Sequence, residues 1–99
     1  MLQLNGVMME LTDKLAIPTH VMARTMGDET VLLDLAIGTY FGLNPVGARI
    51  WQLLGEGKTL ADVCTALLAE YEVERVQLEA DVLRLTGELL ERGLVAQAD

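Results

Sequence analysis

The pattern of apolar and polar positions divides the chain near Asn44. Before this residue, short apolar and β-branched runs are separated by turn-forming residues, which is typical of strands. After it, apolar residues recur with helical spacing and few helix-breaking residues interrupt them. We therefore predict an α+β domain in which a three-stranded antiparallel sheet is followed by three α-helices.

The predicted strands span residues 21–24, 30–34 and 39–43. The connections between them are too short for crossovers, so consecutive antiparallel pairing is the economical topology. In that order the strand at 39–43 lies at an edge of the sheet. Residues 1–15 show no clear period, and no element is assigned to them.

The helices are predicted from their start and stop signals. Asn44-Pro45 is a strong start for a helix over 45–54, because Asn caps free N–H groups and Pro fits the first helical position. A second helix runs from Thr59 to about Glu70. A third begins near Glu74 and ends before Gly93, which suits a left-handed C-terminal cap.

Composition narrows the class of protein. Ninety-nine residues suffice for one domain, and no apolar run reaches the roughly 18 residues of a membrane span. The sequence shows no secretory signal, and its single cysteine excludes an internal disulfide and suits a reducing cytoplasm. Seven basic residues against 15 acidic ones give a net charge of −8, which disfavours nucleic-acid binding.

The residues that carry catalysis in other proteins form no recognisable constellation here. The single histidine, His20, has no nucleophile in a suitable arrangement, and one histidine with one cysteine cannot complete a nitrogen/sulfur zinc site. Cys64 falls on an apolar helix stripe and is expected to be a buried, inert thiol. We therefore expect neither an enzyme nor a bound metal or cofactor.

The third strand is the first feature that indicates binding. Residues 39–43 contain no charge and no proline, although natural proteins usually protect an edge strand with such residues. Either an added strand pairs with this edge, or the unassigned N-terminal segment covers it.

The third helix is the second such feature, because it carries two apolar stripes about 150° apart. The first consists of Leu78, Val82, Leu85 and Leu89, and we assign it to the core with Ile50 and Trp51. The second consists of Val76, Ala80, Leu83, Gly87 and Leu90. This second stripe faces either the first helix or a groove beside the edge strand, where a peptide could add as a β-strand.

Several segments together resemble the PqqD family. They are Leu33-Asp34, the run from Gly38 to Asn44, the run from Gly47 to Trp51, and the closing Gly93-Leu94-Val95. The resemblance covers about residues 17–95. It implies a winged-helix-like fold known as the RiPP recognition element, where RiPP stands for a ribosomally synthesised and post-translationally modified peptide. Such domains are not catalysts; they bind the leader segment of a precursor peptide and present it to modifying enzymes.

The resemblance also implies partners. The chain is most similar to the stand-alone versions in lasso-peptide pathways, which work with a transglutaminase-like leader peptidase. The alternative is a peptide-chaperone role in pyrroloquinoline quinone biosynthesis beside a radical SAM enzyme. A winged-helix DNA-binding regulator is a further rival, but the three arginines of the third helix are outnumbered by its acidic residues.

The family implies that the peptide lies against the third strand and the third helix. On this sequence the strand edge is the backbone of Thr39, Tyr40, Phe41, Gly42 and Leu43. We assign the helix wall to the second stripe and its neighbours, namely Val76, Glu79, Ala80, Leu83 and Thr86.

Overall fold

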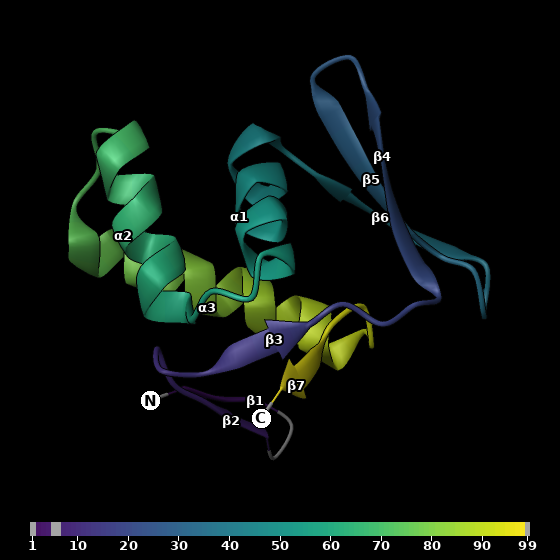
Figure 1. Ribbon diagram of the computed structural model, residues 1–99, viewed down its shortest axis with the longest axis horizontal. Helices are drawn as coiled ribbons and strands as arrows, with labels where there is room; N and C mark the ends of the chain where they lie inside the picture. The colour runs from purple at the N-terminus through teal and green to yellow at the C-terminus, as the bar shows by residue number, and fades with distance from the viewer. Residues whose placement is uncertain (1, 5–6, 99) are drawn as a thin grey trace.

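The computed structural model describes residues 2–4 and 7–98, and within them it contains seven strands and three helices. In chain order these are β1 (Leu2–Leu4), β2 (Val7–Met9), β3 (Lys14–Ala16), β4 (Val21–Met26), β5 (Glu29–Asp34), β6 (Thr39–Leu43), α1 (Pro45–Gly55), α2 (Leu60–Glu70), α3 (Arg75–Glu91) and β7 (Ala96–Ala98). The three helices lie on one side of the β4–β5–β6 sheet (Figure 1).

The main sheet has the predicted order β4-β5-β6 with antiparallel pairing throughout, so β6 is an edge strand. The β4–β5 hairpin extends two residues further along β4 than predicted, to a turn in which Gly27 takes a positive φ of 63°. The second turn is fastened by Asp34, whose buried Oδ1 accepts a hydrogen bond from the Ala36 N–H at 2.9 Å. The predicted meander is confirmed.

A single residue, Asn44, separates β6 from α1. Its side-chain Oδ1 accepts a 2.8 Å hydrogen bond from the Gly47 N–H, which satisfies one of the free donors at the helix start. A Cβ atom at Gly47 would lie 3.3 Å from Asn44 Oδ1 and from a methyl carbon of Leu43. The strand therefore turns directly into the helix, and glycine suits the close approach there.

The N-terminal segment, to which the sequence analysis assigned no element, forms a β1–β2 hairpin and then β3, which pairs with β7. It also closes the start of α2, because the carbonyl oxygens of Asp13 and Leu11 accept hydrogen bonds from the N–H groups of Leu60 and Ala61 at 3.0 and 2.7 Å. Among the described residues, no part of this segment pairs with β6. The alternative in which it covers the edge strand is therefore wrong.

The hydrophobic core lies between the inner face of the sheet and the three helices. Its fully buried side chains include Leu32 from the sheet, Leu54 from α1, Leu67 from α2, and Val82 and Leu89 from α3. The predicted core positions Leu78, Ile50 and Trp51 are also buried, whereas Leu85 is half-buried. None of the described helices is long and apolar enough to cross a membrane.

We expect Asn44→Ala to lower the free energy of unfolding by about 1 kcal/mol, because the Gly47 N–H loses its acceptor. Asn44→Asp keeps a side-chain acceptor and should retain most of the stability. Urea denaturation followed by circular dichroism measures both variants. Equal stability of the alanine variant and the unmodified protein would contradict this role of the cap.

Candidate functional site

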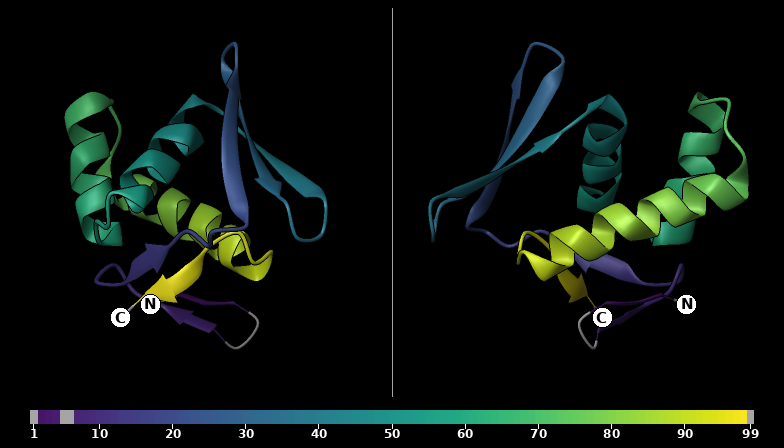
Figure 2. Two further views of the ribbon diagram at one scale, coloured as in Figure 1. Left: turned by 45° about the vertical axis from the view of Figure 1, so that its right-hand side comes forward. Right: turned by 180° about the vertical axis from the view of Figure 1, so that it is seen from behind.

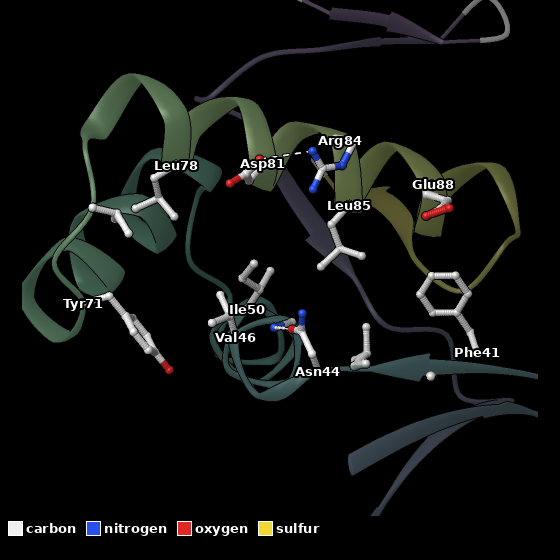
Figure 3. Close-up of a pocket in the computed structure, with 14 residues that line it drawn as sticks. Phe41, Asn44, Val46, Ile50, Tyr71, Leu78, Asp81, Arg84, Leu85 and Glu88 are labelled. Atoms are coloured by element: carbon white, nitrogen blue, oxygen red, sulfur yellow. Dashed lines mark hydrogen bonds and ion pairs between the residues drawn. The ribbon is translucent and has the colours of Figure 1, made fainter. Parts of the chain in front are cut away.

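A groove of about 420 Å³ opens between β6, α1 and α3 (Figure 3). The strand and the junction contribute Phe41, Gly42, Leu43 and Asn44 to its lining. Helix α1 and the α2–α3 connection contribute Val46, Gly47, Ile50, Tyr71 and Val73. Helix α3 contributes Leu78, Asp81, Arg84, Leu85 and Glu88. The groove thus runs along the free edge of the sheet and is bordered by a helix on the opposite side.

The floor of the groove is an apolar surface that continues into the core. Leu43, Ile50 and Leu78 are almost completely buried, while Val46 and Leu85 are half-buried and pack against the same cluster. Leu85 points from α3 into the gap between the helix and the strand (Figure 3). Side chains that enter the groove can therefore exchange water for apolar contact without displacing the core.

Charged groups lie along the α3 side of the groove. Asp81 and Arg84 form an ion pair with 3.1 Å between Oδ1 and the guanidinium nitrogen, and Glu88 follows one turn later. At the C-terminal end of α3, the guanidinium carbon of Arg92 lies 5.1 Å from the centre of the Phe41 ring, within the range of a cation–π contact. This contact ties the end of the helix to the edge strand.

The strand residues predicted for the site lie where the sequence analysis put them, in β6 at the sheet edge. Phe41, Gly42 and Leu43 line the groove. Thr39 does not line it, and Tyr40 directs its side chain to the other face of the sheet, where it is 74% exposed. The Leu43 side chain belongs to the core, so this residue offers mainly its backbone to a ligand.

The helix residues predicted for the site lie elsewhere, and the prediction that they line the groove is wrong. None of Val76, Glu79, Ala80, Leu83 and Thr86 is among the lining residues. Val76 is 78% exposed, Glu79 pairs with Arg75 at 3.1 Å, and Ala80 is exposed. Leu83 packs against the core, and the buried hydroxyl of Thr86 donates a 2.7 Å hydrogen bond to the Val82 carbonyl.

Part of the second apolar stripe of α3 is covered within the molecule. Strand β1 contacts α3, and Leu83, Gly87 and Leu90 are half or fully buried although they lie outside the groove. The second apolar stripe thus does not line the groove, and its C-terminal half is covered. The groove instead receives one flank of the first stripe, from Leu78 and Leu85, together with the polar residues beside it.

The groove residues that were not predicted from the sequence fall into three groups. The first lies at the start of α1 and consists of Asn44, Val46, Gly47 and Ile50. On α3, Asp81, Arg84 and Glu88 follow from Leu78 and Leu85 by helical spacing, so a correct choice of stripe would have found them. Tyr71 and Val73 lie in the connection before α3, where two large apolar residues close together in a short connection were the available signal.

Other chemically capable side chains have structural roles. His20 lies beside the buried Asp34, with 3.9 Å between Nε2 and Oδ1. Burial raises the pKa of the Cys64 thiol, which keeps it protonated and unreactive at neutral pH. Within residues 2–4 and 7–98, no three His, Cys, Asp or Glu side chains gather as a metal site would require.

Comparison with known proteins identifies the family of this chain. Residues 29–95 match the family described as Coenzyme PQQ synthesis protein D (PqqD). The chain belongs to the PqqD family. No curated protein sequence matches it.

Two solved structures are similar over most of the chain. "TbiB1 in Complex with the TbiA(beta) Leader Peptide" is 42% identical with a TM-score of 0.75, and the match covers 81% of this chain and 93% of TbiB1. "Lasso peptide synthetase B1 complexed with the leader peptide" is 35% identical with a TM-score of 0.76, and the match covers 83% and 96% of the two chains.

Proposed function

We propose that this PqqD-family chain is a non-catalytic RiPP recognition element of lasso-peptide biosynthesis. It binds the leader segment of a precursor peptide as an added β-strand and presents it to a leader peptidase or another modifying enzyme. One observation carries this proposal: the unpaired edge of β6 borders an apolar groove whose opposite side is α3.

The geometry suggests how the two parts of the site divide recognition. Free N–H and C=O groups along β6 would pair with the peptide main chain, which gives affinity without reading the sequence. Because successive side chains of a strand point to opposite faces, every second peptide side chain would enter the groove. These anchors would pack against Val46, Ile50 and Leu85, so the apolar floor would select large apolar residues at alternate positions.

The similar structures support the lasso-peptide assignment, since both are described as complexes with a leader peptide. The family description favours a second candidate, a peptide-chaperone role in pyrroloquinoline quinone synthesis. Both roles would use the same groove and differ in the precursor that it receives. A cytoplasmic location and the absence of a cofactor stay predictions from the sequence.

We expect the purified protein to bind its leader peptide and leave it chemically unchanged. The probe is a labelled synthetic leader from the precursor encoded in the same gene cluster. Fluorescence anisotropy measures the affinity, and mass spectrometry after prolonged incubation with the full precursor measures any turnover. Absence of binding would contradict the recognition role, whereas cleavage or modification by the pure protein would show that the chain is an enzyme.

The groove itself is tested by two leucines of α3 that are both half-buried. Leu85 lines the groove and Leu83 does not, so Leu85→Ala should weaken leader binding while Leu83→Ala leaves it nearly unchanged. A buried leucine contact is worth about 1.5–3 kcal/mol, so the expected loss at position 85 is about tenfold or more in affinity.

Both variants lose the same atoms from one helix, so their thermal stabilities, measured by circular dichroism, control for general damage. If only Leu83→Ala loses binding, the peptide contacts the second apolar stripe of α3, as predicted from the sequence. Unchanged affinity in both folded variants would show that the peptide does not use α3.

A further inference from the structure

The outer face of the sheet, turned away from the helices, is largely apolar and carries one basic and one acidic residue, Arg24 and Glu29. Residues directly opposite each other in antiparallel strands share a face. The β4–β5–β6 register therefore places Met22, Leu33 and Tyr40 in one outward row and Arg24, Val31 and Gly42 in the next. Met26 and Glu29 form a third pair beside the hairpin turn.

This apolar face is open to solvent. Tyr40 is 74%, Met26 63% and Met22 40% exposed, and Val31 and Leu33 between them are only half-buried. Helix α1 contacts β5 and β6 from the inner side, and no described helix or strand lies over the outer face (Figures 1 and 2). A contiguous apolar face of this kind is typical of an interaction surface.

Within the β4–β5–β6 register, Arg24 is the only basic residue on this face. Among the arginines, Arg49, Arg75 and Arg84 form ion pairs and Arg92 stacks on Phe41. Arg24 makes neither kind of contact among the described residues, although the chain carries an excess of acidic groups. An unpaired guanidinium within an apolar face complements a partner surface that is apolar and carries a carboxylate.

We propose that the outer face of the sheet is the docking surface for the enzyme that acts on the bound peptide. This inference rests on the proposed function. The partner surface would be apolar, with an acidic side chain opposite Arg24. Met22, Leu33 and Tyr40 would form the apolar centre of the contact, which aromatic and methionine side chains commonly provide.

The position of this face relative to β6 argues for that enzyme. A peptide strand added to β6 would extend the sheet by one strand. The peptide side chains that do not enter the groove would then point outward in line with Tyr40. An enzyme on the outer face would contact the domain and the peptide at once, so docking would place the peptide beside its active site.

A second copy of this chain fits the face less well. Each chain carries a net charge of −8, so association of two copies brings like charges together. A partner enzyme need not carry the same charge, and a carboxylate opposite Arg24 would be attracted to this face. The proposed partner of this face is therefore the enzyme and not a second copy of the chain.

The test uses two substitutions on β4, the strand farthest from the peptide edge. Arg24→Glu reverses the unpaired charge, and Met22→Gln replaces an exposed apolar side chain with a polar one of similar length. Lys14→Glu is the matched control, because it makes the same change of net charge at an exposed position of another strand, β3. The probe is the purified leader peptidase encoded in the same gene cluster, immobilised for biolayer interferometry with peptide-loaded protein.

We expect both β4 variants to keep leader affinity within about twofold and to weaken peptidase binding by about tenfold or more, with Lys14→Glu unchanged in both assays. Peptidase binding that neither β4 variant weakens, or that is absent in the unmodified protein, overturns the docking surface. A dimer in sedimentation analysis that Arg24→Glu dissociates overturns it too, because a second copy then occupies the face.

A failure of the proposed function can be distinguished from a failure of the docking surface. If the unmodified protein does not bind the leader, the recognition role fails. Peptidase binding can then still be measured with protein that carries no peptide. That measurement shows whether Met22 and Arg24 contribute to binding the enzyme.

Discussion

The architecture depends on the connection at Asn44, where the edge strand passes into α1 through one residue. Leu43 is buried on one side of this residue, and the Asn44 side chain holds the Gly47 N–H on the other. A connection this short leaves α1 little freedom to move relative to the sheet. It holds the helix against the inner face, so the edge of β6 stays free and the groove forms beside it.

Helix α3 contributes to the core, lines the groove and contacts β1, which explains why its apolar surface is broad. Val82 and Leu89 pack in the core, Leu85 lines the groove, and β1 also contacts the helix. A free apolar edge strand is ordinarily an aggregation hazard. Here α3 borders that edge, and the Arg92–Phe41 contact ties its end to the strand. A single extended peptide fits this space more readily than the edge of another sheet.

The sheet thus carries two unlike surfaces on one small scaffold. Its inner face meets the helices and opens at β6 into the groove. Its outer face exposes methionine, tyrosine and Arg24, which forms no ion pair among the described residues. The alternation of side chains along a strand separates these two roles within β6, where Phe41 faces the groove and Tyr40 faces outward. A peptide and an enzyme could therefore bind together without competing for the same side chains.

The sequence by itself determined the elements that local chemistry specifies. Asn44-Pro45 and Thr59 mark helix starts through their own caps, the glycines mark turns, and the uncharged run of β6 marks an open edge. It could not decide which stripe of α3 meets the groove, because both stripes are apolar and nearly equivalent by periodicity. That choice came from contacts distant in sequence, which bring Leu78 and Leu85 into one groove with Phe41 of the edge strand, while β1, which has no clear pattern of its own, also contacts α3.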